Sequence, residues 1–370
     1  MIPIFRPAFG DEEVDAVAEV LRSGWIGLGP KTKQFEEEFA KFAAVPHAIG
    51  MNSCTAALDI AVRLLDIGLG DEVIVPTMTF VSTAHVVAYN LGTPVFADVD
   101  PITLNIDPED VARKITRRTK AIVVVHHSGR PVDLDGIRAV AKDIPVIEDC
   151  AHAAGSHYRG QPVGGLGDIG CFSFQAVKNL ATGDGGMVTT KNDQWAKRAM
   201  SLRWLGIDRS TWDRTDLDRS YRWNYNLEEI GLKCHMNDIA AALGLVQLRR
   251  LKDMNDKRHD IVRRYQAGLA NIDQIDLPAD DDETFRSSWH MFCIRCDRRD
   301  DLSSELESHG IASGVHYTPI HLYDCYGNRP VLPVAEAQYP RLLTLPLYPT
   351  LEDADVDRII QVIRDFHKAG

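Results

Sequence analysis

Lys178 is the residue of this 370-residue sequence whose surroundings most suggest covalent chemistry. It follows the largely aromatic and apolar stretch 172–177 and precedes a glycine-rich turn at 182–186. Burial among such residues lowers the pKa of an amine and makes it nucleophilic, as Schiff-base chemistry requires. The alternative is an ordinary lysine whose stem packs against apolar residues while its head reaches water.

A carboxylate stands at the end of an apolar segment. Asp149 belongs to the sequence Glu-Asp-Cys-Ala-His at 148–152, which follows the apolar stretch 144–147. Ligands bind at the carboxyl ends of strands in a parallel sheet, so Asp149 is a candidate binding group. The alternative is that Asp149 caps the next helix.

A third candidate site lies at 52–57, between a short strand and a helix. Small and hydroxyl-bearing residues gather there, including Ser53, Cys54 and Thr55. The free backbone N–H groups of a helix N-terminus point toward one spot and suit a phosphate. Simple capping of the helix by Ser53 or Thr55 is the alternative.

The three sites together are more specific than any one of them. Lys178 follows Asp149 by 178 − 149 = 29 residues, and both lie downstream of the possible phosphate cradle. A pyridoxal phosphate site requires these parts: a lysine for the Schiff base, a carboxylate that keeps the pyridine nitrogen protonated, and a phosphate cradle.

The elements that must position these residues alternate along the chain. Short apolar and β-branched segments, typical of strands covered on both faces, are separated by helical patterns. This alternation predicts an α/β fold with a parallel sheet between helices. Strands are expected at 72–75, 93–97, 121–125 and 146–148, and helices at 11–23, 32–43, 55–65, 83–89, 108–115 and 134–141.

A change of character marks the C-terminal third. A helix is expected from 236 to 269, apolar in its first half and highly charged in its second. We therefore predict a large domain at 1–250 and a smaller one at 251–370. The smaller domain is expected to contain a strand at 288–294, a helix at 301–309 and a terminal amphipathic helix.

The composition is that of an ordinary globular protein, with 45% hydrophobic and 25% charged residues. The 41 basic and 53 acidic residues give a net charge of −12, which argues against nucleic acid or an anionic membrane as partner. No transmembrane segment or signal peptide is evident. Seven dispersed cysteines, an odd number, predict reduced thiols in a cytoplasmic protein.

Three further groups of residues have side chains that could bind a metal or a diphosphate, but their pattern favours a structural role. Cys293 and Cys296 would face opposite sides of a strand, and the adjacent His126 and His127 diverge on an extended chain, so no metal site is expected. A cluster of arginines has the charge to meet a diphosphate. Interspersed aspartates favour a solvated, self-neutralised loop instead. These arginines are Arg203, Arg209, Arg214, Arg219 and Arg222.

Linked motifs along nearly the whole chain resemble the DegT/DnrJ/StrS family of sugar aminotransferases. They include 23–26 (Ser-Gly-Trp-Ile), 52–57, 75–80 (Val-Pro-Thr-Met-Thr-Phe), 148–154, 173–186, 231–244 and 314–317 (Gly-Val-His-Tyr). The resemblance implies the fold-type-I pyridoxal phosphate architecture. That architecture has a large domain with a mostly parallel seven-stranded sheet between helices, and a smaller α+β C-terminal domain.

The resemblance also implies roles at the cofactor. Lys178 would be the Schiff-base lysine and proton carrier, and Asp149 would pair with the pyridinium nitrogen. Phe80 would stack on the ring, and His152 would lie beside it near the phenolic oxygen. The phosphate would be held by Ser173 and the loop of Ser53, Cys54 and Thr55.

The stretch after Gly231 would come from the neighbouring subunit, which implies a homodimer with shared active sites. The family usually places Asn or Arg there against the phosphate, whereas this chain has His235, whose charge depends on pH. The family's substrate-facing segments correspond to Trp25, His316, Tyr317 and His321. Structural roles for the two histidines and a packed tyrosine are the alternatives.

The function that this resemblance implies is ping-pong transamination. Glutamate would convert pyridoxal phosphate to its pyridoxamine form and leave as 2-oxoglutarate. The amine would then pass to a keto sugar carried on a nucleotide diphosphate, for a surface polysaccharide or a glycosylated metabolite. A keto-cyclitol or keto sugar acid is an alternative substrate.

Two other functions remain as rivals. Sugar 3-dehydratases of the same fold carry histidine in place of the lysine, so Lys178 argues against that chemistry. A non-catalytic regulator would not need Lys178, Asp149 and Ser173 together.

Overall fold

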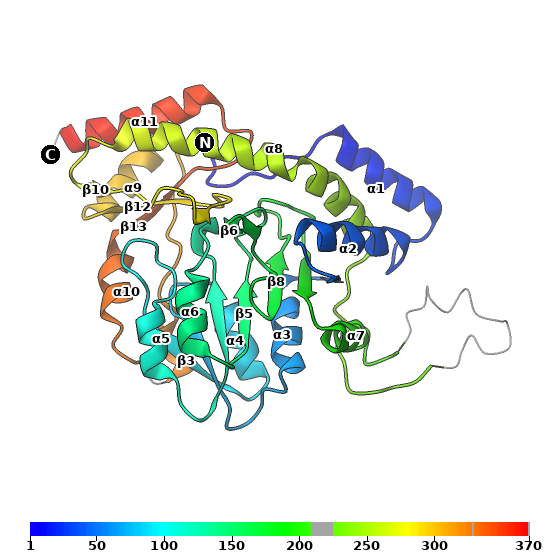
Figure 1. Cartoon of the computed structure of the whole chain (residues 1–370). Helices are drawn as coiled ribbons and strands as arrows, with labels where there is room; N and C mark the ends of the chain where they lie inside the picture. The colour runs from blue at the N-terminus through cyan, green and yellow to red at the C-terminus, as the bar shows by residue number, and fades with distance from the viewer. Residues whose placement is uncertain (209–224, 328, 369–370) are drawn as a thin grey trace.

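A seven-stranded sheet forms the centre of the computed structural model, which describes residues 1–208, 225–327 and 329–368 (Figure 1). Within it only β9 runs against the other strands, since it pairs antiparallel with both β1 and β8. The mostly parallel sheet predicted from the sequence is therefore confirmed. In spatial order the strands are β1 (His47–Met51), β9 (Gly186–Thr190), β8 (Ile169–Ser173), β5 (Val146–Asp149), β4 (Thr119–Val125), β2 (Glu72–Pro76) and β3 (Thr93–Ala97).

The central strands are buried on both faces, which explains their apolar sequences. In β4, Ile122 and Val124 join one hydrophobic core, while Ala121 and Val123 join the core on the opposite face. Side chains alternate between the faces of a strand, so each face needs its own helical cover. The residue pattern alone predicts neither β8 nor β9.

Helices cover the two faces (Figure 1). One core contains residues of α2 (Pro30–Phe42), α5 (Pro108–Lys114), α6 (Leu134–Ala141) and the first half of α8 (Asp238–Leu269). The opposite core contains residues of α3 (Cys54–Leu64), α4 (Ser82–Tyr89) and α7 (Asp193–Leu202). The N-terminal helix α1 (Asp11–Ser23) packs against α8.

α8 links this body to a third core. Its second half contributes Ile261, Val262 and Tyr265 to a cluster with the C-terminal strands and helices. That unit contains β10 (Ile275–Asp276), β12 (Phe292–Cys296), β13 (Leu342–Leu345), α9 (Arg299–Ser308) and α11 (Asp353–Lys368). The short α10 (Pro333–Gln338) instead joins the core of α3 and α4 through Ala335. The predicted division at residues 250 and 251 falls within the unbroken α8, and it remains a prediction.

The strand predicted at 288–294 begins later than expected, at Phe292. The preceding Trp289 has a φ of 49°, outside the extended region, and Ser288 and His290 bond to other loops. A small sheet is formed by β11 (Phe285–Arg286), β6 (His157–Tyr158) and β7 (Gln161–Pro162). Single 3₁₀ turns lie at His127–Gly129, Ile320–Leu322, Asp324–Tyr326 and Tyr339–Arg341.

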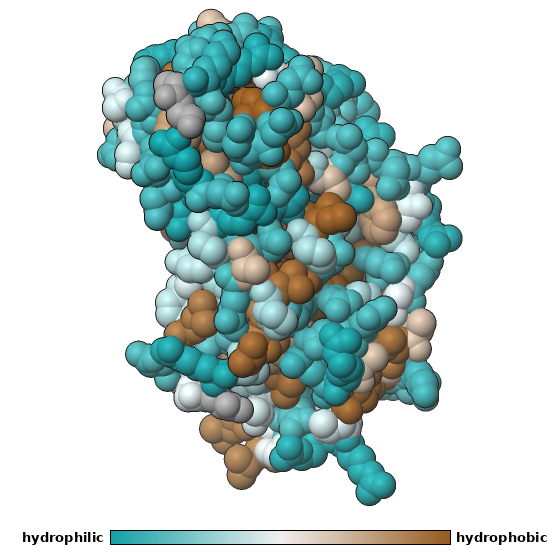
Figure 2. Space-filling view, turned by 90° about the vertical axis from the view of Figure 1, so that its left-hand side faces the viewer, coloured by the Kyte–Doolittle hydropathy of each residue, from teal (hydrophilic) through white to brown (hydrophobic). Residues whose placement is uncertain are grey.

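The surface on the side of the C-terminal unit is mainly hydrophilic at the top of Figure 2, with hydrophobic residues interspersed below. Isolated exposed hydrophobic side chains are ordinary on protein surfaces. No helix in the described part of the chain is long and apolar enough to cross a membrane.

Arg203 does not belong to a solvated loop, contrary to expectation. It is buried, and its guanidinium bonds the Glu36 carboxylate and the carbonyl of Gly50. The remaining arginines of the predicted cluster, Arg209, Arg214, Arg219 and Arg222, lie outside the described residues.

A buried carboxylate at the start of α8 holds the start of α2. Asp238 accepts hydrogen bonds from the backbone N–H groups of Lys31 (3.1 Å) and Thr32 (2.9 Å), and from the Thr32 hydroxyl (2.7 Å). Two N–H groups that the helix cannot satisfy itself thereby gain a charged acceptor.

We predict that Asp238→Ala lowers the free energy of unfolding by about 2 kcal/mol, because it leaves two N–H groups and a hydroxyl without their acceptor. Urea unfolding followed by circular dichroism measures the change. Asp253→Ala, at an exposed position of the same helix, is the control and should cost less than about 0.5 kcal/mol. Equal losses in the two variants would contradict the capping role.

Candidate active site

A cavity of about 420 Å³ opens at the carboxyl ends of the central strands. Its walls come from the large sheet, from α3 and α4, from the N-terminal segment and from the C-terminal unit. Ten of the residues singled out from the sequence line it: Ser53, Cys54, Thr55, Phe80, Asp149, His152, Ser173, Lys178, His316 and Tyr317.

The N-terminus of α3 forms one end of this cavity. The Ser53 hydroxyl accepts a hydrogen bond from the N–H of Ala56 (3.1 Å), so it caps the helix. The N–H groups of Cys54 and Thr55 have no acceptor among the described residues. Ser173 lines the same cavity. Two free helix N–H groups and a hydroxyl make a site that fits a phosphate.

Asp149 ends β5 and lies at the bottom of the cavity. One carboxylate oxygen accepts from the Thr83 hydroxyl (2.9 Å) and the other from the N–H of Ala151 (3.1 Å). Burial raises the pKa of Asp149, although both hydrogen bonds and the charge of Lys178 oppose that rise. No helix follows Asp149, so the capping alternative is wrong. A protonated ring nitrogen would supply the cation that this buried carboxylate lacks.

Lys178 stands in the turn between β8 and β9, where it lines the cavity. Burial lowers the pKa of its amine to about 8, although the neighbouring Cys54 and Asp149 favour the charged form. About a tenth of the amine is therefore unprotonated at pH 7, far more than for an ordinary lysine, and this form can attack a carbonyl.

Aromatic rings form the opposite wall. The Nε2 atom of His152 lies 3.0 Å from the Tyr317 hydroxyl, and the Tyr317 and Phe80 ring centroids are 6.1 Å apart. The buried Nδ1 atom of His152 has no hydrogen-bond partner among the described residues. Burial, together with the nearby Lys178, lowers the pKa of His152 well below its ordinary value, so this ring is neutral.

Several lining residues were not identified from the sequence. They are Phe5, Thr79, Ser82, Gln175, Asp184 and His290. His290 stacks on His152 with centroids 4.7 Å apart, and on Phe5 at 5.2 Å. These residues come from four remote parts of the chain, and the packing of the N-terminal and C-terminal segments over the sheet adds Phe5 and His290 to the cavity.

Three predicted site residues lie outside the lining of this cavity. Trp25 donates from Nε1 to the carbonyl of Leu28 (3.1 Å). His321 is buried, with Nδ1 2.5 Å from the Thr77 hydroxyl and Nε2 3.3 Å from Glu336.

His235 is the third of these residues, and its ring packs edge-on against Trp204. Burial lowers the pKa of His235 to about 4, with help from nearby Lys233 and Arg203. Within this chain the ring is therefore neutral at physiological pH. The contact that the resemblance assigns to His235 remains a prediction.

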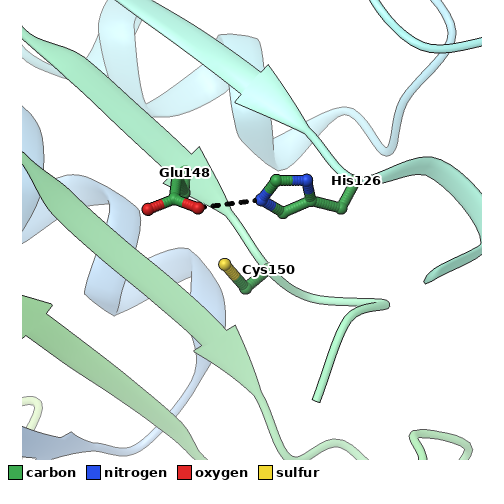
Figure 3. Close-up of side chains that lie close together, drawn as sticks. All are labelled: His126, Glu148 and Cys150. Atoms are coloured by element: carbon green, nitrogen blue, oxygen red, sulfur yellow. Dashed lines mark hydrogen bonds and ion pairs between the residues drawn. The ribbon is translucent and has the colours of Figure 1, made fainter. Parts of the chain in front are cut away.

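His126, Glu148 and Cys150 converge behind the cavity wall, with donor atoms close enough to hold a metal ion (Figure 3). The lone pairs of His126 and Glu148, however, accept hydrogen bonds from the protein. His126 Nδ1 accepts from the N–H of Val132 (3.0 Å), so its Nε2 carries the hydrogen that meets Glu148 (3.1 Å).

The Glu148 carboxylate also accepts three backbone N–H groups, from Gly164, Leu166 and Gly167. Burial alone would raise the pKa of Glu148, but these bonds and His126 outweigh it and keep the carboxylate charged. The hydrogen bonds of His126 and Glu148 form a buried structural network.

Comparison with known proteins adds independent findings. The chain is 41% identical to the spore coat polysaccharide biosynthesis protein SpsC of Bacillus subtilis, over 100% of this chain and 98% of that one. Spr1654 of Streptococcus pneumoniae, solved in a PLP form, superposes with a TM-score of 0.92 at 35% identity, covering 100% of this chain and 99% of that one. It has also been solved in a PMP form.

The sugar aminotransferase CalS13 of Micromonospora echinospora superposes with a TM-score of 0.91 at 31% identity, over 99% of this chain and 100% of that one. A model of the DegT/DnrJ/EryC1/StrS aminotransferase family matches residues 7–364. The fold, the cavity and these likenesses agree, and the chain belongs to the DegT/DnrJ/EryC1/StrS aminotransferase family.

Proposed function

We propose that this enzyme transfers an amino group from L-glutamate to a keto sugar carried on a nucleotide diphosphate. The observation that carries the proposal is that Lys178, Asp149 and the free N–H groups of α3 line one cavity. The enzyme is an aminotransferase whose cofactor is pyridoxal 5'-phosphate, which alternates with the pyridoxamine form. When bound, the cofactor supplies an aldehyde that accepts the amine and a ring that withdraws electrons.

Lys178 carries out the covalent and proton-transfer work. Its neutral Nζ atom is the group that would hold the cofactor covalently, with water lost from the aldehyde, and that would be released when the donor's amine takes its place. The freed Nζ atom then removes the proton from the donor's Cα atom. In the second half of the cycle it delivers a proton to the sugar carbon that receives the nitrogen.

The other residues bind and orient. Asp149, held by Thr83 and Ala151, stays ionised opposite the protonated ring nitrogen and stabilises its charge. Phe80 would cover the ring and His152 would lie beside its phenolic oxygen, since both line the cavity. Ser173 and the N–H groups of Cys54 and Thr55 hold the phosphate.

The substrate proposal rests on the relatives and on the chemistry of the walls. SpsC is named for polysaccharide biosynthesis and CalS13 for aminating a sugar. We assign His316 and Tyr317 to the sugar, with Trp25 and His321 as the remaining candidates. The proposed assembly is a homodimer in which His235 reaches the partner's site. A keto-cyclitol or keto sugar acid is the alternative substrate.

The proposed location is the cytoplasm, where nucleotide sugars are made. All seven cysteines are free, as expected for a reducing compartment.

We predict that Lys178→Ala abolishes the visible absorbance of the lysine-bound cofactor and lowers kcat at least about 1,000-fold, because nucleophile and proton carrier are both lost. Spectra of the purified protein and release of 2-oxoglutarate measure the two effects. Lys191→Ala, at an exposed position, is the matched control. Unchanged turnover in Lys178→Ala would refute the mechanism.

The rate at which cofactor-free protein captures pyridoxal phosphate should rise with pH. Below the Lys178 pKa of about 8 the amine is protonated and inert, so the rate should climb about tenfold per pH unit and level off above that value. Asp149→Asn removes a charge that favours protonated Lys178, so it should move the midpoint to lower pH.

Stopped-flow absorbance between pH 6 and 9, roughly the range in which a lysine with this pKa titrates, follows the capture. Asp143→Asn, at an exposed position, should leave the midpoint in place. A flat profile for the wild type would contradict the role of the neutral amine.

Substrate class is tested by incubating the enzyme with glutamate and a panel of acceptors. Keto sugars linked to a nucleotide diphosphate should support release of 2-oxoglutarate, whereas free keto sugars should react at least about tenfold more slowly, because they lack the nucleotide's binding energy. Turnover of a cyclitol ketone with none of the nucleotide sugars would select the alternative.

A further inference from the structure

His290 lines the cavity beside His152. Its ring lies between Phe5 and His152, almost parallel to both, at interplanar angles of 4° and 24°. It is 1% exposed and lines the cavity, whereas Asn179, which it contacts, stands behind the cavity wall. The ring therefore contacts the protein through Nδ1 and also borders the cavity.

The amide of Asn179 is fixed by its acceptors. Its Nδ2 atom donates to the carbonyl of Ser288 (2.8 Å) and to Oδ1 of Asn255 (2.9 Å). Rotating the amide by 180° would set its oxygen against the Ser288 carbonyl, where neither atom can donate. Asn255 is fixed in the same way, since its Nδ2 donates to the carbonyl of Ala154 (3.0 Å).

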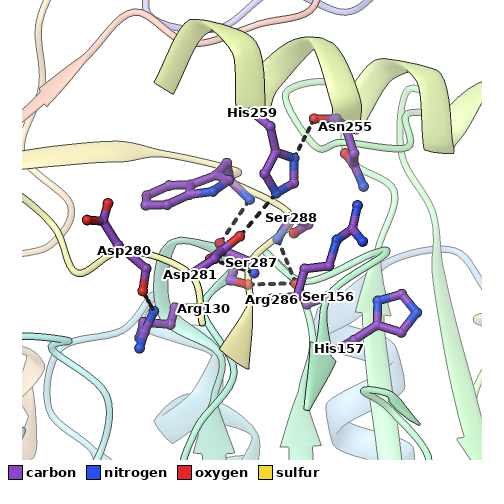
Figure 4. A network of polar contacts seen from close by, with 12 residues as sticks. Arg130, Ser156, His157, Asn255, His259, Asp280, Asp281, Arg286, Ser287 and Ser288 are labelled. Carbon is purple, nitrogen blue, oxygen red and sulfur yellow. Dashed lines mark hydrogen bonds and ion pairs between the residues drawn. The ribbon is translucent and has the colours of Figure 1, made fainter. Parts of the chain in front are cut away.

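A wider network holds these backbone groups in place (Figure 4). The N–H of Ser288 donates to the Ser156 hydroxyl (3.0 Å), and Ser156 donates to the carbonyl of Gly129 (2.6 Å). His259 donates to the carbonyl of Asn255 (2.8 Å) and to Asp281 (3.1 Å). The acceptors that orient Asn179 are thus rigidly placed.

The orientation of Asn179 decides which nitrogen of His290 carries the hydrogen. The Asn179 atom that faces His290 is Oδ1, an acceptor, at 3.1 Å from Nδ1. Nδ1 must therefore donate, and in the neutral ring Nε2 is left with a lone pair. The hydrogen bond found for the His290 ring within the described part of the chain is the one at Nδ1. Burial, together with Lys178 and Arg258, lowers the pKa of His290 well below its ordinary value, so the ring is neutral.

We infer that His290 is a substrate-binding residue whose Nε2 atom accepts a hydrogen bond from a hydroxyl of the acceptor sugar, and that Asn179 is the positioning residue that fixes its tautomer. This inference rests on the proposed function, because of the two substrates only the sugar carries such hydroxyl groups. A neutral acceptor favours a hydroxyl over a carboxylate, so His290 serves the sugar half-reaction and not the glutamate half-reaction.

The test separates the two half-reactions by stopped-flow absorbance of the cofactor. His290→Phe keeps the stacked ring and removes the lone pair. We expect it to lower kcat/KM for the keto sugar about 10-fold, the size of one lost hydrogen bond, and to change the glutamate half-reaction less than about 3-fold. His290→Gln, a polar replacement of similar reach, should recover part of the loss and serves as a second variant if His290→Phe does not fold. The exposed His309→Phe is the matched control.

A second readout addresses Asn179 directly. Nitrogen-15 labelling of the histidines reports which ring nitrogen carries hydrogen, and the His290 signals are assigned by their loss in the His290 variants. The wild type should show the Nδ1–H tautomer, and Asn179→Leu should lose it and weaken the sugar half-reaction. A hydrogen on Nε2 in the wild type would overturn the inference.

The remaining outcomes are also decisive. An equal loss in both half-reactions, or none in either, would overturn the sugar-binding role while leaving the proposed function intact. Failure of the wild type to aminate any keto sugar would overturn the proposed function, and this inference with it.

Discussion

The site depends on holding two groups together in one buried cavity: a carboxylate that keeps its charge and an amine that is only weakly basic. Parallel strands make this possible, because the carboxyl end of β5 brings Asp149 to the same edge of the sheet as the N-termini of α3 and α4. There Thr83 and Ala151 hold the carboxylate, and burial keeps the Lys178 amine only weakly basic. Both groups are thereby poised for a cofactor that carries positive charge at its ring nitrogen.

Strand β5 also carries a buried carboxylate on the other face of the sheet, at Glu148, the residue before Asp149. Glu148 and Asp149 are neighbours in sequence, yet they point to opposite faces, as alternate residues of a strand must. Glu148 faces the side of α6 and α8, where it accepts three backbone N–H groups and the His126 hydrogen. Its buried charge thus fixes the loop after β7 and the end of β5. The position of Asp149 follows from that anchorage.

The site residues that lie where a strand ends or a helix begins could be predicted from the sequence. The apolar run before Asp149 and the small residues around Ser53 are local signals, and they predicted a strand end and a helix start correctly. Strand β9 was missed because its glycine and threonines carry no marked apolar pattern, although the strand is buried between β1 and β8. Phe5 and His290 were missed for a different reason: they enter the cavity through contacts between remote segments, which no local pattern encodes.

The charge of the cavity also differs from that of the whole chain. The net charge of −12 belongs to the whole chain and does not bear on one phosphate site, because the cavity carries few charges of its own. Burial lowers the pKa values of His152, His290 and His316, and Lys178 acts in the same direction on each, so these rings are neutral. Because these rings are neutral, the charged side chains that line the cavity are Asp149, Lys178 and Asp184. The N-terminus of α3 adds a partial positive charge at the phosphate end. A protonated ring beside Lys178 would make its amine a weaker base still and compete with the cofactor for Asp149. Keeping the histidines neutral therefore leaves Asp149 to the cofactor and leaves the ring nitrogens as hydrogen-bonding groups for uncharged hydroxyls.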